Sequence, residues 1–149
     1  MRRCRPRPAG RAGADYPESV SEELDAETLE FAHRMFDLAR DGTTGEIAGY
    51  VDAGLPVDLT NDKGDTLLIL AAYHAHPDTV AALLARGADH TRTNDRGQTA
   101  LAAAVFRSST GAVRALLDAG ADPGHGSPSA VETAQFFDLP EMLALLRSR

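Results

Sequence analysis

The stretch that decides the fold runs from Gly64 to Asp89 and reads G-D-T-L-L-I-L-A-A-Y-H-A-H-P-D-T-V-A-A-L-L-A-R-G-A-D. The same pattern returns 33 residues later, from Gly97 to Asp122, as G-Q-T-A-L-A-A-A-V-F-R-S-S-T-G-A-V-R-A-L-L-D-A-G-A-D. A threonine two residues after the first glycine, a pair of leucines and a closing Gly-Ala-Asp recur together at one offset. The chain therefore contains an internal repeat.

The local chemistry of each copy predicts two short helices followed by a hairpin. Thr66 can cap the N-terminus of a first helix that runs to about Tyr73. Pro77 suits the first turn of a second helix, and Gly87 can end that helix in the left-handed conformation. Residues 89–97 are polar and rich in turn formers, which favours a hairpin that projects from the helices. One such unit cannot bury its own apolar face, so neighbouring units must stack.

A period of 33 residues with this G-x-T…L-L…G-A-D frame resembles the ankyrin repeat. Both central copies depart from the T-P-L-H tetrapeptide of the family, reading T-L-L-I and T-A-L-A. The resemblance covers about residues 26–149. It implies an all-α fold, a solenoid of stacked antiparallel helix pairs with hairpin loops. We expect an ankyrin-repeat domain over residues 22–149, with units at about 22–53, 54–86, 87–119 and 120–149.

The two outer units are expected to be atypical, because one face of each meets water. Ser21 or Asp25 is expected to cap the first helix of the first unit, and Gly42 to end it. Its predicted inward side consists of Leu24, Leu29, Ala32, Met35, Phe36 and Ala39. The last unit aligns at an offset of 30 residues, with Ser129 in the place of Thr99, which predicts a shortened hairpin.

The charge of the chain is unevenly distributed. The net charge is -7, but residues 1–13 contain five arginines and no acid, so the rest of the chain carries -12. In residues 1–21 the arginines alternate with Pro, Ala and Gly, and we predict a disordered basic tail without a secretory signal. The acidic body argues against non-specific nucleic-acid binding, which leaves a nucleic-acid role for the tail as a minor alternative.

Several chemical functions find no support in the sequence. Cys4 is the only cysteine, which excludes an intrachain disulfide and a thiolate zinc site. The five histidines show no spacing typical of a metal site, and no nucleophile elbow, phosphate-binding glycine loop or HExxH helix is present. No apolar run approaches the roughly 20 residues of a membrane helix. We therefore expect no metal, no cofactor, no membrane contact and no catalysis.

The ankyrin resemblance implies that the chain binds a protein partner through its concave side, formed by the hairpin tips and first helices. The candidate partner-binding residues, assigned by repeat position, are Thr60, Asp62, Lys63, Asp65, Tyr73, His74, Thr93, Asp95, Arg96, Gln98, Phe106, Arg107 and Phe136. Tyr73, Phe106 and Phe136 are equivalent in three units and should form a ladder of rings. Phe137 is expected to tuck under a hairpin, since adjacent aromatic residues on one helix cannot both face the same groove.

Two other functional classes stay open. An accessory or regulatory subunit of an enzyme could act through the acidic body and basic tail, and its binding would then vanish at moderate salt. A small enzyme on a repeat scaffold has less support, and would lose activity when a histidine or an acid is replaced. We further expect a monomer in the cytoplasm. The abundance of Ala, Gly and Arg is consistent with a GC-rich bacterial genome.

Overall fold

The computed structural model describes residues 18–148, with side chains from Ala26 onward. Residues 1–17 of the predicted tail lie outside the described residues, and residues 18–21 belong to a helix. Contacts along the chain divide it into a unit that ends at His33 and a unit that begins at Arg34. The two units are described separately. Throughout residues 18–148 the regular elements are helices, so the prediction of an all-α fold is confirmed.

Helix α1 spans Glu18–Asp41. It begins before Ser21 and Asp25, so the prediction that one of them caps it is wrong. The segment E-S-V-S-E-E-L-D combines helix formers with acids, which favour a helix N-terminus, and this explains the earlier start.

The inward side of α1 is shorter than predicted. Met35, Phe36 and Ala39 are buried as expected, whereas Leu29 is 58% exposed, so the prediction for Leu29 is wrong. The 24 residues of α1 give it a length of about 36 Å, and its buried residues Met35, Phe36 and Ala39 all belong to about its last two turns. Leu24 lies outside the described side chains.

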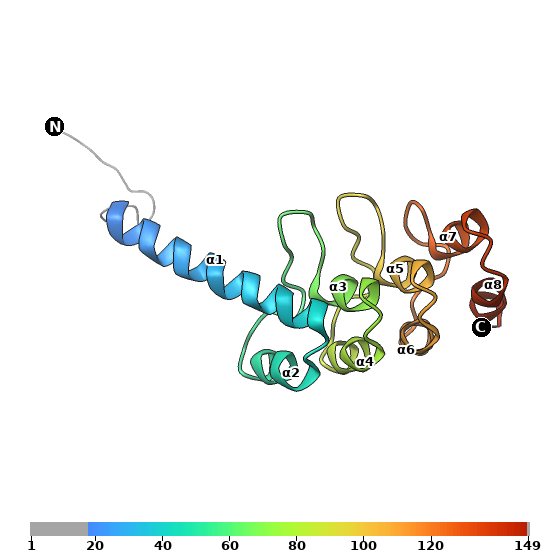
Figure 1. Ribbon diagram of the computed structural model, residues 1–149, viewed down its shortest axis with the longest axis horizontal. Helices are drawn as coiled ribbons and strands as arrows, with labels where there is room; N and C mark the ends of the chain where they lie inside the picture. Colours follow the sequence, from blue (N-terminus) through green and yellow to red (C-terminus); the bar gives the residue numbers. More distant parts are fainter. Residues whose placement is uncertain (1–17, 149) are drawn as a thin grey trace. The chain divides into compact units, whose positions relative to one another are not determined.

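The unit that begins at Arg34 is a stack of helix pairs (Figure 1). Its further helices are α2 (Thr44–Asp52), α3 (Leu67–Tyr73), α4 (Pro77–Ala85), α5 (Ala100–Phe106), α6 (Thr110–Asp118), α7 (Ala130–Phe136) and α8 (Pro140–Arg147). The first helices form one layer, in which α5 packs against both α3 and α7. The second helices form another layer, in which α2, α4, α6 and α8 pack in that order. This arrangement is the predicted ankyrin-repeat solenoid.

Side-chain caps fix where the first helices begin. Thr66 accepts a hydrogen bond from the backbone N–H of Ile69 at 3.1 Å, and Thr99 repeats the contact one unit later. In the last unit Ser129 and Glu132 cap each other reciprocally, with N···O distances of 2.9 and 3.1 Å. These caps confirm the roles predicted for Thr66 and Thr99.

Between the two helices of each pair, the chain turns at one residue that has a left-handed backbone conformation. Gly42 has φ +74°, and the equivalent residues in the next units are Ala75, Ser108 and Asp138, with φ between +53° and +61°. At Gly42 a Cβ atom would lie 2.5 Å from Nδ1 of His76, whose Nε2 contacts the carbonyl oxygen of Arg40 at 2.6 Å. Glycine is therefore favoured at this corner chiefly by the close approach of His76, since the other three corners reach the left-handed conformation without it.

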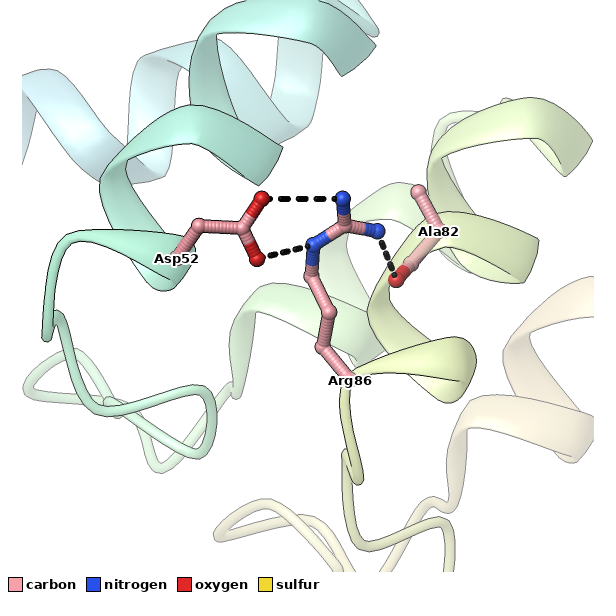
Figure 2. A network of polar contacts seen from close by, with 3 residues as sticks. All are labelled: Asp52, Ala82 and Arg86. Atoms are coloured by element: carbon pink, nitrogen blue, oxygen red, sulfur yellow. Dashed lines mark hydrogen bonds and ion pairs between the residues drawn. The ribbon is translucent and has the colours of Figure 1, made fainter.

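Figure 2 shows a polar network that joins the second helices of the first two units. Nε and Nη2 of Arg86 donate to the two carboxylate oxygens of Asp52 at 2.9 and 3.2 Å. Nη1 of Arg86 donates to the carbonyl oxygen of Ala82, which orients the guanidinium. Chiefly because of the Arg86 hydrogen bond, the pKa of Asp52 lies below its ordinary value. The pair therefore links α4 to the end of α2 through a forked, charge-assisted contact.

Candidate partner-binding groove

Two equivalent asparagines shape the first two hairpins. Oδ1 of Asn61 accepts the backbone N–H groups of Lys63 and Asp65, at 2.9 and 3.0 Å. Oδ1 of Asn94 accepts those of Arg96 and Gln98, both at 3.0 Å. An asparagine that bonds the backbone two and four residues onward closes a tight turn. Each turn places an exposed acid–base pair at the hairpin tip, Asp62-Lys63 in one and Asp95-Arg96 in the next.

Neighbouring hairpins are hydrogen-bonded to one another. The backbone N–H of Asp95 donates to the carbonyl oxygen of Lys63 at 3.0 Å, and that of Ser127 donates to Gly97 at 2.9 Å. Nδ2 of Asn94 also donates to Oδ1 of Asp65 at 2.8 Å. The hairpins therefore form a continuous wall beside the first helices.

Asp65 belongs to this wall and not to the exposed surface. Its side chain is 7% exposed, and its carboxylate accepts the amide of Asn94 from the next hairpin. The prediction placed Asp65 among the partner contacts by repeat position alone. Because a buried carboxylate that is already hydrogen-bonded offers little to a partner, we assign it a structural role instead.

Four aromatic side chains form a row at the C-terminal ends of the first helices α3, α5 and α7. The ring centroids of Tyr73 and Phe106 lie 5.8 Å apart, those of Phe106 and Phe137 5.1 Å, and those of Phe137 and Phe136 4.9 Å. His74 extends this aromatic row at the Tyr73 end, with a centroid distance of 5.3 Å. The rings are in contact with one another and remain accessible, with Phe136 81% exposed.

The aromatic row differs from the predicted ladder in its third ring. The ring that meets Phe106 is Phe137, not its repeat equivalent Phe136. Phe137 follows α7 as its C-cap, about 100° further around the helix axis, which turns it toward α5. Phe137 is 49% exposed, so the expectation that it tucks under a hairpin is also wrong.

Two adjoining cavities follow the concave side. One, which we call the hairpin groove, has a volume of about 680 Å³ and lies between the first two hairpin tips and α3. The other, the aromatic groove, has a volume of about 550 Å³ and is lined by the aromatic row, Pro128, Glu132 and Thr133. Tyr73, Arg96 and Gln98 line both cavities, which makes the two grooves continuous.

Most of the predicted site residues meet at these grooves. Those that line one or both are Asp62, Lys63, the largely buried Asp65, Tyr73, His74, Asp95, Arg96, Gln98, Phe106 and Phe136. The guanidinium of Arg107 lies 5.9 Å from the centre of the Tyr73 ring, within the range of a cation–π contact. Thr60 and Thr93 are exposed but line neither groove. The sequence interpretation missed Arg40, Pro128 and Glu132 as lining residues; only Glu132 carried a signal, the capping box with Ser129.

One arginine, Arg96, lines the aromatic groove, and a second, Arg107, borders it. Its one lining acid is Glu132, and an oxygen of that carboxylate is held by the backbone N–H of Ser129. Among the described residues, neither Arg96 nor Arg107 forms an ion pair. The pKa of His74 is lowered, first by burial and then by the positive charges of Arg40 and Arg107. The imidazole is therefore biased toward its neutral form, which meets the Tyr73 ring edge to face without adding charge.

Among the side chains that the structure describes, no three of His, Cys, Asp or Glu come close enough together to hold a metal ion. None of the helices described is both long and apolar enough to cross a membrane. The arrangement that the structure offers is thus a solvent-open groove with rings, arginines and backbone-fixed hairpin tips.

Comparison with known proteins fits this geometry. A family model for ankyrin repeats, in three copies, matches residues 37–126. The chain belongs to the ankyrin-repeat family. Over 63 residues it is also 52% identical to a Pseudomonas aeruginosa protein that is named as an ankyrin repeat protein. That alignment covers 42% of this chain and 37% of the relative, so the chain spans well under half of that protein's length.

Proposed function

We propose that this ankyrin-repeat chain binds a segment of a protein partner along its concave side, across the hairpin groove and the aromatic groove. Ankyrin repeats are generally protein–protein interaction modules, built on a non-catalytic fold. The observation that carries the proposal is the aromatic row, because its four rings touch one another inside a groove and the three phenylalanines among them are exposed to solvent. Contiguous exposed apolar surface of this kind marks interaction sites, and aromatic residues dominate interface energetics.

The backbone supports the same surface. Exposed hairpin tips are held by Asn61 and Asn94, and adjacent hairpins are bonded to one another. A surface that is already ordered loses little conformational entropy when a partner binds. The groove is therefore suited to binding a partner without refolding.

A capture experiment tests the proposal. The wild-type chain, a Phe106→Ser/Phe136→Ser variant and a Tyr50→Ser variant are each immobilised and exposed to lysate of the host organism. Tyr50 is a matched control, because it is an exposed aromatic residue of α2 and lines neither groove. We expect a protein that is retained by wild type and Tyr50→Ser and lost by the groove variant. Equal capture by all three chains would move the binding site away from the aromatic row.

In the alternative in which the chain is an accessory or regulatory subunit, the partner is an enzyme and the association depends on charge. This alternative would be supported if the captured protein were an enzyme and if capture were lost at moderate salt, as expected of charge-dominated association. Retention at high salt would instead favour the apolar contacts of the aromatic row.

A further inference from the structure

We propose that the partner segment in the aromatic groove presents a large apolar side chain with a carboxylate beside it. This inference rests on the proposed function of the groove and adds the chemistry of its occupant. Three features carry the inference: the rings of the groove, the two arginines without ion pairs that border the rings, and the presence of only one acid in the lining.

The apolar part follows from the lining of the cavity. Phe106, Phe136 and Phe137 expose 40%, 81% and 49% of their surface, and Pro128 lies on the facing hairpin side. The volume of about 550 Å³ exceeds that of any single side chain, so the groove can accept one together with its neighbours. Burying a large aliphatic or aromatic side chain against these rings removes apolar surface of both partners from water.

The acidic part follows from the charges that border the rings. Arg96 lines the groove, and Arg107 lies over the Tyr73 face, 5.9 Å from its centre. No ion pair joins either guanidinium to an acid within the part of the chain that the structure describes. Both arginines thus stand beside the rings with their carboxylate-binding edges unpaired.

Only one acid, Glu132, stands beside these two arginines in the lining of the aromatic groove. The carboxylate of Glu132 is held by the backbone of Ser129 as part of the helix cap. The exposed acids of the hairpin tips, Asp62 and Asp95, line the hairpin groove and not the aromatic groove. With Arg96 and Arg107 beside the rings and Glu132 as the one lining acid, this part of a chain with a net charge of -7 carries a formal charge of +1.

Charge complementarity then selects among possible occupants. A guanidinium binds a carboxylate through two parallel hydrogen bonds, which fixes the position of the acid relative to the rings. A basic segment would be repelled by the two arginines. An uncharged segment would remove water from the guanidinium groups without supplying an acceptor that replaces the lost hydrogen bonds. An apolar side chain next to Asp or Glu satisfies both the rings and the arginines.

A peptide selection tests the inference on the full chain. Randomised peptides displayed on phage are selected on the wild-type protein, and the enriched sequences are synthesised and assayed for affinity. We expect enriched peptides to share a large apolar residue within a few positions of Asp or Glu. Their affinity should fall about tenfold or more for Arg96→Glu/Arg107→Glu, and a Glu→Lys change in the peptide should recover part of that loss.

Matched variants keep the outcomes distinct. Arg114→Glu carries the same charge change on α6, away from both grooves, and should leave affinity unchanged. Arg96→Gln/Arg107→Gln is a milder pair, to be used if charge reversal perturbs folding, and should give an intermediate loss. Enrichment of basic or uncharged sequences, or indifference to the arginine variants, would overturn the inference while leaving the groove as a binding site. Peptides that bind a Phe106→Ser/Phe137→Ser variant as well as wild type would overturn the proposed function too.

Discussion

The rings of Tyr73 and Phe106 lie parallel to one another across neighbouring repeats, with centroids 5.8 Å apart and planes 2° from parallel. Phe106 is 40% exposed, so this contact lies at the surface of the groove and not in the core between the helices. Parallel rings at this spacing attract each other beyond the area that they bury. The aromatic row therefore joins consecutive repeats while it offers a surface to a partner.

The stacked pair should show measurable coupling in stability. In a double-mutant cycle of Tyr73→Ala and Phe106→Ala, urea unfolding should give an interaction energy of about 0.5–1.5 kcal/mol. Tyr73 and Phe136 serve as the control pair, since no direct ring contact joins them among the described residues, and should couple by less than about 0.5 kcal/mol. Equal coupling in both cycles would mean that the stacking contributes nothing of its own.

Replacement of Asn94 should destabilise the chain more than replacement of Asn61. Asn94 is buried, and it bonds two backbone N–H groups as well as the carboxylate of Asp65, whereas Asn61 bonds two backbone N–H groups at a partly exposed position. Asn94→Ala leaves a buried carboxylate short of a partner, so we expect a loss of about 2–4 kcal/mol against about 1 kcal/mol for Asn61→Ala. Chemical denaturation of the two variants measures the difference, and equal losses would contradict the structural role of Asp65.

Two glycine substitutions should act in opposite directions. Gly42→Ala introduces a Cβ atom 2.5 Å from His76 at a residue with φ +74°, so unfolding free energy should fall by about 2 kcal/mol or more. Gly49→Ala lies within α2 with no atom within 4 Å of the new Cβ, and should stabilise by about 0.5–1 kcal/mol. Thermal melts of both variants check the pair; a stable Gly42→Ala chain would show that the corner can open without cost.

Stability should decline in mild acid because of His74. Burial and nearby positive charges lower its pKa in the folded chain below the ordinary value of 6.5, so the unfolded chain binds more protons between these two pKa values. The contribution is therefore complete above pH 6.5 and is lost as pH falls through the folded pKa.

Replacing His74 should reduce this pH dependence. The drop in unfolding free energy between about pH 7.5 and pH 5 should be smaller for His74→Gln than for wild type. Denaturant titrations across that range give the comparison, and an identical slope in both chains would exclude His74 as the source.

The forked contact between Arg86 and Asp52 should be visible as a carboxyl titration. Because Arg86 stabilises the ionised form, Asp52 should titrate below its ordinary pKa of 3.8 in the folded chain. Arg86→Gln should return that pKa toward the ordinary value. Nuclear magnetic resonance of the Asp52 side chain follows both, and an unshifted Asp52 in the wild-type chain would mean that the contact does not persist in solution.

The sequence predicted those features that depend on short stretches of chain. Thr66 and Thr99 cap helices because each hydroxyl reaches a backbone N–H three residues away, and the repeat offset placed the helix pairs. The burial of Asp65 could not be read this way, since it depends on Asn94, which lies 29 residues onward and packs on it only after the hairpins stack.

The third ring of the aromatic row shows a different limit. Phe136 and Phe137 are adjacent, and repeat alignment selected Phe136 as the partner of Phe106. The choice between them depends on which side of α7 faces α5, a property of helix packing that no local pattern records. The start of α1 was missed for a further reason, because capping residues inside a run of helix formers need not begin a helix.

The two backbone hydrogen bonds between hairpins have a practical consequence. The amides of Asp95 and Ser127 stay shielded from solvent deuterium only while their repeats remain side by side, because each acceptor belongs to the preceding hairpin. The exchange rate of Asp95 therefore reports on separation of the first and second hairpins, and that of Ser127 reports on separation of the second and third. The two amides are thus native probes of repeat opening, and no label needs to be attached to the protein to use them.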